Sequence, residues 1–281
     1  MKKYGGNELN YLKQVLNNKK PSTGSWNKEL ERKFSKVFKG KYAIAMNSGT
    51  ATLHSALEAL GVSAGDEVIS PALTVIMDTT ATLHANAIPV YADVDRETYN
   101  ITADEIEKKI TKKTKAIIVV SVYGLPCDMD EIIKLSKKYK IPIIEDHAQT
   151  VLATVNNKAL GVRGDFASWS FESSKHISSG EGGMLLTNNS SLAQKARKIS
   201  GQGYANLTAD GGVIKFGNDS DFLSPKFNRH DTLGWNYRMN EFTAAIALAQ
   251  LENIEEKVKK RVYVANKFLE VINQYEILKP Q

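Results

Sequence analysis

The chain has 281 residues, of which 42% are hydrophobic and 24% are charged, and this is the composition of a folded globular protein. Its length allows one large domain or two unequal ones. The net charge of +6 comes from lysines spread over several segments, which favours solvated helix faces over a nucleic-acid surface. A single cysteine, Cys127, excludes an internal disulfide and any metal site built from several cysteines.

No apolar stretch reaches the roughly 20 residues that a bilayer span needs. The N-terminus also lacks the apolar segment that secretion signals carry. We therefore expect a soluble cytoplasmic protein with no metal site and with neither nucleic acid nor a membrane as its partner.

Short β-branched runs alternate with amphipathic segments along most of the chain. Several of the runs are apolar almost throughout, which is typical of strands covered on both faces. Helix-capping patterns begin at Thr102 and Asp128, and the helix that contains Leu53 is expected to end at Gly61. The alternation predicts an α/β fold with a largely parallel sheet. The expected strands are residues 42–46, 67–70, 88–91, 117–122, 141–145, 166–170 and 183–187.

Two later segments break this alternation. Residues 202–236 are rich in Gly, Asn, Asp and Ser without a clear period, and a loop of this length is usually functional, an interface arm or disordered. Asn240 then begins a long helix, in which apolar residues recur every three or four positions up to Ile272. The interpretation we favour for this helix is a bridge between two domains.

The first candidate site is an anion site after the strand at 42–46. Open α/β sheets bind ligands beyond the carboxyl ends of their strands. Here residues 47–50 (Asn-Ser-Gly-Thr) lead directly into a helix, whose free backbone N–H groups would favour a phosphate. Helix capping by Ser48 alone explains the same residues equally well. The chain contains no nucleotide P-loop motif.

Two further strand ends carry charged residues. Asp146 belongs to an acidic pair that follows an apolar strand, where a carboxylate needs a cationic or hydrogen-bonding partner unless the strand end is solvated. Lys175 follows the strand at 166–170 among small residues. It is either a surface lysine or a desolvated amine suited to forming a Schiff base. Together, a phosphate site, an acid and a lysine meet the requirements of pyridoxal phosphate.

A resemblance to a known family follows from these motifs taken in order. The chain resembles the DegT/DnrJ/EryC1/StrS family of pyridoxal-phosphate-dependent nucleotide-sugar aminotransferases, which have the type I fold. The matching segments cover nearly the whole chain. They are residues 47–57, 65–68, 88–90 with Asp93, 145–149, 170–171 with Lys175, 180–183 and 235–241.

The resemblance implies a role for each matching residue. Lys175 resembles the lysine that forms the Schiff base and moves the proton, and Asp146 matches the acid that pairs with the pyridine nitrogen. Sister dehydratases carry a histidine in place of the lysine, so Lys175 favours transamination. The remaining cofactor-binding matches are Gly49, Thr50 and Ser170 at the phosphate, Gln149 near the ring hydroxyl, and Val75, where an aromatic ring usually stacks.

Asn236 resembles the asparagine that reaches the phosphate from the neighbouring subunit, which implies a homodimer with shared active sites. The resemblance also implies a domain division. Residues 1–239 would form an N-terminal arm and the large cofactor-binding domain. Residues 240–281 would form the inter-domain helix and the start of an incomplete C-terminal domain.

We therefore expect an aminotransferase that uses pyridoxal 5'-phosphate in sugar or polysaccharide biosynthesis. It would move an amino group from an amino acid, glutamate by family resemblance, to a nucleotide-linked keto-sugar. Two alternatives stay open: a non-nucleotide keto-cyclitol as acceptor, and cofactor binding without turnover.

Overall fold

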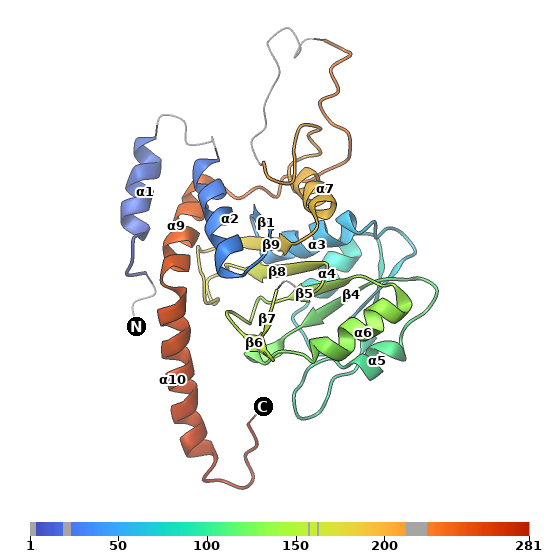
Figure 1. Cartoon of the computed structure of the whole chain (residues 1–281), viewed down its shortest axis with the longest axis vertical. Coiled ribbons are helices and arrows are strands. Elements are labelled where there is room, and N and C mark those ends of the chain that lie inside the picture. Colours follow the sequence, from blue (N-terminus) through green and yellow to red (C-terminus); the bar gives the residue numbers. More distant parts are fainter. Residues whose placement is uncertain (1–3, 19–23, 157, 162, 212–223, 281) are drawn as a thin grey trace.

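One mixed sheet forms the centre of the molecule. The computed structural model describes residues 4–18, 24–156, 158–161, 163–211 and 224–280 (Figure 1). The strands of the central sheet are β1 (Tyr42–Met46), β2 (Glu67–Pro71), β3 (Ile88–Ala92), β4 (Thr114–Val120), β5 (Ile143–Asp146), β8 (Phe166–Ser170) and β9 (Gly183–Thr187). Within the described residues they pair in the order β1-β9-β8-β5-β4-β2-β3. A separate hairpin pairs β6 (Thr154–Val155) with β7 (Lys158–Ala159).

The strand directions bring most carboxyl ends to one edge. Neighbouring strands are parallel from β3 across to β8, whereas β9 is antiparallel to both β8 and β1. Among the described strands of this sheet, β9 therefore runs alone in the opposite direction. The carboxyl ends of β1, β5 and β8 consequently meet at the same edge, together with the start of β9.

Helices cover both faces of the sheet. They are α1 (Glu8–Asn17), α2 (Ser25–Val37), α3 (Gly49–Ala59), α4 (Met77–His84), α5 (Ala103–Glu107), α6 (Met129–Tyr139), α7 (Ser190–Ser200), α9 (Glu241–Glu252) and α10 (Ile254–Ile272). In β4, Ala116 and Ile118 pack with α3, α4 and α7, whereas Ile117 and Val119 pack with α5 and α6. In strands β1, β8 and β9 the side chains alternate in the same way. One set packs with α3, α4 and α7, and the other set packs with α2 and α9. The predicted α/β fold with a largely parallel sheet is confirmed.

Four strands differ from their predicted bounds. Those expected at 67–70 and 88–91 each extend one residue further, to Pro71 and Ala92. The strand expected at 117–122 begins at Thr114 and ends at Val120, because the chain then enters the 3-10 turn η1 (Val122–Gly124), where Tyr123 has φ 54°. The strand expected at 141–145 is Ile143–Asp146. The N–H of Ile141 closes the end of α6 on Ser136 O instead of pairing in the sheet. Apolar character alone does not separate a helix end from a strand start.

The predicted long helix is interrupted. Asn240 caps its start as expected, since its side chain accepts a hydrogen bond from Thr243 N at 2.9 Å. The helix does not run unbroken to Ile272, because Asn253 (φ −108°, ψ 13°) leaves the helical region between α9 and α10. Helix α9 is buried on most sides, whereas Ile254 is the buried residue of α10, which runs along the edge of the molecule in Figure 1.

The loop expected at 202–236 lies partly outside the described residues, which exclude 212–223. The described residues at the two ends of this loop pair with one another through isolated backbone bridges. Tyr204 bridges His230, and Gly201 bridges Asn236. The N–H of Asn47 then donates to Tyr237 O at 2.8 Å, so the end of this segment lies beside the end of β1.

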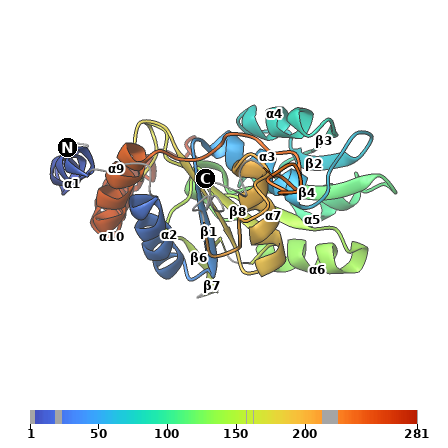
Figure 2. The ribbon, with the colours of Figure 1, turned by 90° about the horizontal axis from the view of Figure 1, so that it is seen from above.

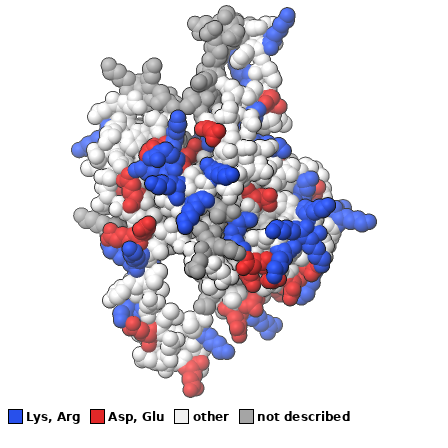
Figure 3. Space-filling model, viewed as in Figure 1, with Lys and Arg blue, Asp and Glu red and all other residues white. Residues whose placement is uncertain are grey.

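The charges on the face shown in Figure 3 are mixed, with basic and acidic side chains side by side. Ion pairs account for part of this pattern on α5 and α6. Lys108 pairs with Glu105 at 2.5 Å, and Lys138 pairs with Glu107 at 2.7 Å. Among the described residues, no helix has both the length and the apolar character that crossing a membrane requires.

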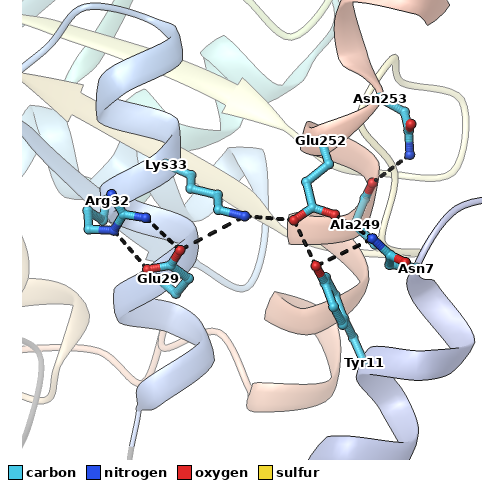
Figure 4. A network of polar contacts seen from close by, with 8 residues as sticks. All are labelled: Asn7, Tyr11, Glu29, Arg32, Lys33, Ala249, Glu252 and Asn253. Atoms are coloured by element: carbon cyan, nitrogen blue, oxygen red, sulfur yellow. Dashed lines mark hydrogen bonds and ion pairs between the residues drawn. The ribbon is translucent and has the colours of Figure 1, made fainter.

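The N-terminal helices hold α9 through its last turn. Figures 1 and 2 place α1 on the outside of α9. Glu252 accepts hydrogen bonds from Tyr11 Oη at 2.8 Å and Asn7 Nδ2 at 3.0 Å, and it pairs with Lys33 Nζ at 2.7 Å (Figure 4). Burial acts to raise the pKa of Glu252, but these contacts outweigh it and hold that pKa below its ordinary value. The network fixes α9 just before the break at Asn253.

A second carboxylate joins α2 to α9. Glu241 is buried at the start of α9 and accepts hydrogen bonds from Trp26 N at 3.1 Å and Ser25 Oγ at 3.3 Å. Gly24, the residue before α2, supplies no side-chain cap. Glu241 therefore caps α2 from another helix and also places a negative charge at its positive end.

Replacing Glu241 by alanine should destabilise the protein by about 1–3 kcal/mol, because it removes the cap of α2 and leaves partly buried donors without an acceptor. The free energy of unfolding, measured in urea, tests this. Glu256→Ala is the matched control: Glu256 lies exposed on α10, where it pairs with Lys260, and its loss should change the unfolding midpoint little. Equal effects of the two substitutions would contradict the capping role.

Candidate active site

The first residues of α3 and the end of β8 form a close-packed cradle. Ser48 caps α3 by accepting a hydrogen bond from Ala51 N at 3.1 Å. A Cβ on Gly49 would lie 2.9 Å from Ser170 Cβ, and a Cβ on Gly183 would lie 2.5 Å from Ser48 O. Glycine at both positions therefore permits this approach. Gly49, Thr50 and Ser170, predicted as phosphate contacts, converge at a helix N-terminus that favours an anion.

Two hydroxyl groups that the sequence analysis did not single out hold the cradle in place from the buried side of α3. Thr52 Oγ1 and Ser168 Oγ lie 2.6 Å apart, and both residues are fully buried. Thr52 Oγ1 also lies 2.6 Å from Gly49 O, to which it donates. The pair ties α3 to β8 beneath Gly49. A polar residue at an inward position of an apolar strand was the signal for Ser168.

The acidic pair at the end of β5 divides into two roles because successive residues of a strand face opposite ways. Glu145 accepts hydrogen bonds from the backbone N–H groups of Arg163 at 3.0 Å and Gly164 at 2.6 Å, and it lies 3.2 Å from His147 Nε2. Burial opposes its ionisation, but the His147 contact and these bonds lower the pKa of Glu145. Glu145 is therefore satisfied within the fold.

Asp146 is directed to the other face. It is 2% exposed, and its Oδ1 accepts a hydrogen bond from Ala148 N at 2.9 Å. Burial raises the pKa of Asp146, although the Ala148 N–H and the positive charge of Lys175 act to lower it. A second buried carboxyl, Asp78 on α4, neighbours Asp146. Sequence reasoning missed Asp78, because an acid in the first turn of a helix is an ordinary surface pattern.

Lys175 lies in the loop after β8 and is half-buried. Within the described part of the chain, its ammonium group makes no hydrogen bond and no ion pair. Glu172, three residues earlier, is instead engaged by Ser173 and Ser174, which lower its pKa to about 2. Burial, followed by the charges of Arg261 and Lys175, lowers the pKa of His176 to about 4. His176 is thus neutral at neutral pH and adds no positive charge beside Lys175.

Gln149 is fixed by an unusual turn. Its Oε1 accepts a hydrogen bond from Tyr123 N at 2.7 Å, and Tyr123 has φ 54° within η1. This contact orients the Gln149 amide near the ends of β4 and β5. The structure thus connects Tyr123 to the site through its backbone.

Within the described part of the chain, the other two predicted residues make no hydrogen bond to the predicted residues described above. Val75 lies in the loop before α4 and is 37% exposed. Asn236 is exposed; its backbone oxygen accepts from Asn47 Nδ2 at 3.3 Å, and its side chain accepts from Arg238 Nε at 3.1 Å. No cluster of three or more potential metal ligands occurs among the described residues.

The site fits pyridoxal phosphate, since it combines a phosphate cradle closed by glycine, a buried carboxyl and an uncommitted lysine at one edge of the sheet. This combination defines the class of pyridoxal-phosphate enzymes with the type I fold. A model of the DegT/DnrJ/EryC1/StrS aminotransferase family matches residues 2–280, and the chain belongs to this family. The cofactor of the family is pyridoxal 5'-phosphate.

Similar proteins agree with this assignment. The GDP-perosamine synthase of Escherichia coli O157:H7 is 37% identical over 95% of this chain and 69% of its own length, and that of Caulobacter vibrioides is 39% identical over 91% and 64%. The chain thus spans about two thirds of the length of these relatives.

Solved structures give the same result. The aminotransferase from Psychrobacter cryohalolentis superposes with a TM-score of 0.87 at 33% identity, over 98% of this chain and 68% of its own. A putative sugar aminotransferase from Streptococcus pneumoniae, solved in its PMP form, superposes with a TM-score of 0.81 at 25% identity, over 93% and 68%.

Gly49→Ala should weaken the binding of pyridoxal phosphate by about tenfold or more, since crowding against Ser170 costs on the order of 1–3 kcal/mol. The dissociation constant, measured by quenching of tryptophan fluorescence, tests this. Gly5→Ala is the control, because a Cβ on Gly5 meets nothing within 4 Å. Unchanged affinity in Gly49→Ala would show that the cradle does not bind the phosphate.

Proposed function

We propose that this protein is a pyridoxal-phosphate-dependent aminotransferase that moves an amino group from glutamate to a GDP-linked keto-sugar, in the biosynthesis of an amino sugar. The observation that carries the proposal is the convergence of the Gly49–Ser170 cradle, Asp146 and Lys175 at one sheet edge. The choice of acceptor rests on similarity to GDP-perosamine synthases.

Each residue at this edge would have a separate task in holding the cofactor. Gly49, Thr50 and Ser170 would bind its phosphate, and Asp146 would face its ring nitrogen. Gln149, held by Tyr123 N, would lie near the ring hydroxyl, and Val75 would pack against the ring face. A charge-assisted hydrogen bond such as that of Asp146 is worth about 1.5–3 kcal/mol.

The proton movements would belong to Lys175. When bound, pyridoxal phosphate supplies an electron-withdrawing ring that carries the amino group between two half-reactions. Lys175 Nζ would hold the cofactor covalently until the donor amine replaces it. The freed amine would then take up and return the proton that moves during amino transfer. Because donor and acceptor react in turn, the kinetics should be ping-pong.

We extend the proposal to assembly, domains and location. A homodimer would bring Asn236 of one subunit to the phosphate of the other, and the exposed apolar residues Leu73, Ile76 and Met77 near Val75 support such an interface. Residues 1–239 would form the arm and large domain, and residues 240–281 the connection to a second domain. The buried, unpaired Cys127 fits a cytoplasmic location.

Lys175→Ala should slow the conversion of glutamate to 2-oxoglutarate by about 10²–10⁴-fold, because it removes the acid–base group. Single-turnover mixing of the cofactor-loaded protein with glutamate measures this. Lys259→Ala, an exposed lysine on α10, is the control and should react at the wild-type rate. A wild-type protein that binds the cofactor but never converts glutamate would instead be a binding protein without turnover.

Mixing two inactive variants tests the shared site. Lys175→Ala and Asn236→Ala homodimers should each be impaired, but subunit exchange should restore about a quarter of the wild-type sites, because each mixed dimer contains one site with both residues intact. Activity measured after mixing, with and without subunit exchange, is the readout. Absence of recovery in dimers that have exchanged would place Asn236 in its own subunit's site or outside any site.

A further inference from the structure

The carboxyl group of Asp78 is buried beside the site without a role in the chemistry described above. Asp78 lies in the first turn of α4 and is 0% exposed. Its Oδ2 accepts a hydrogen bond from Thr74 Oγ1 at 2.6 Å. Its Oδ1 is also buried and receives no hydrogen bond from any donor of the described residues. A further polar neighbour of this carboxyl is that of Asp146, which is also buried and acts on it through its charge and side-chain hydrogen bonding.

A role at the helix start does not account for Asp78. Acidic residues are favoured in the first turn of a helix because they face the positive end of its dipole. Asp104 has this place in α5 and is exposed, so it keeps its hydration. Asp78 has lost its hydration completely, which is costly for a carboxylate unless a partner compensates. A negatively charged partner can compensate for this loss only when a proton lies between the two carboxyl groups.

The surroundings decide where that proton lies. Burial and the negative charge of Asp146 raise the pKa of Asp78 well above its ordinary value. Burial also raises the pKa of Asp146, but the N–H of Ala148, the side chain of His147 and the positive charge of Lys175 favour its ionised form. Two buried carboxyls in contact share one proton, and these neighbours leave the negative charge on Asp146.

We propose that Asp78 is a positioning residue, whose protonated carboxyl donates a hydrogen bond to Asp146 and holds it as a carboxylate toward the ring nitrogen of pyridoxal phosphate. The proposal rests on the proposed function, because it takes Asp146 as the partner of that nitrogen. The bond from Asp78 would fix the rotation of the Asp146 side chain and satisfy the oxygen that otherwise lacks a donor. Thr74 would hold Asp78 in turn.

The shared proton is tested on the cofactor-free protein. Infrared difference spectra at neutral pH should show the carbonyl band of a protonated carboxyl in the wild type and its loss in Asp78→Asn. Asp104→Asn is the matched control, since it removes a first-turn aspartate from an exposed position, and it should keep the band. A wild type without the band, or an Asp78→Asn protein that retains it, overturns the proposal.

The positioning role is tested by the affinity for pyridoxal phosphate. Asp78→Asn keeps a hydrogen-bond donor of the same shape, so its dissociation constant should stay within about threefold of the wild type. Asp78→Leu fills similar space without a donor and should weaken binding by about tenfold or more. Equal affinity in Asp78→Leu and wild type overturns the role, as does an equal loss in both variants.

The two readouts separate this inference from the proposed function. A wild type that shows the infrared band but does not bind pyridoxal phosphate overturns the proposed function and, with it, the positioning role, while the proton pair stands. A wild type that binds pyridoxal phosphate and converts glutamate but lacks the band overturns the proton pair alone.

Discussion

The central constraint on this protein is that helices bury both faces of its sheet. Strands such as β4 present apolar side chains to a helix layer on each side, so polar chemistry has no place along them. Polar side chains are tolerated where the strands end. Since all described strands of the sheet except β9 run the same way, several of these ends meet at one edge. The cradle, the acid and the lysine are thereby brought together.

Burial also sets the electrostatics of that edge. Glu145 and Asp146 are adjacent in β5, yet strand alternation sends one into the fold and the other toward α3 and α4. The carboxylate of Glu145 is fully engaged by backbone N–H groups and His147, so its role is structural. Asp146 meets one backbone N–H, a neighbouring carboxyl and the field of Lys175. The same low-dielectric surroundings that make a lone carboxylate costly also make a paired one an effective partner for a cation.

Sequence patterns predicted the sheet well because strands buried on both faces are apolar runs of recognisable length. The strand bounds at residues 42–46, 166–170 and 183–187 are confirmed. The patterns were wrong at Ile141, which closes α6, and at Asn253, which divides the expected long helix. In each case one backbone conformation changes while the apolar period continues. Periodicity records which face of an element is buried and is insensitive to a single residue that leaves the helix.

The sequence by itself determined the class of fold, the family and the small set of residues that carry its motifs, because these depend on local spacing along the chain. Tertiary structure decided which of two adjacent acids faces the site, how closely Gly49 approaches Ser170, and that Gln149 is oriented by Tyr123. It also brought Asp78 to Asp146 across 68 positions of the chain. Such contacts join elements that are distant in sequence, and they exist only once the helix layers have closed over the sheet and removed water from between them.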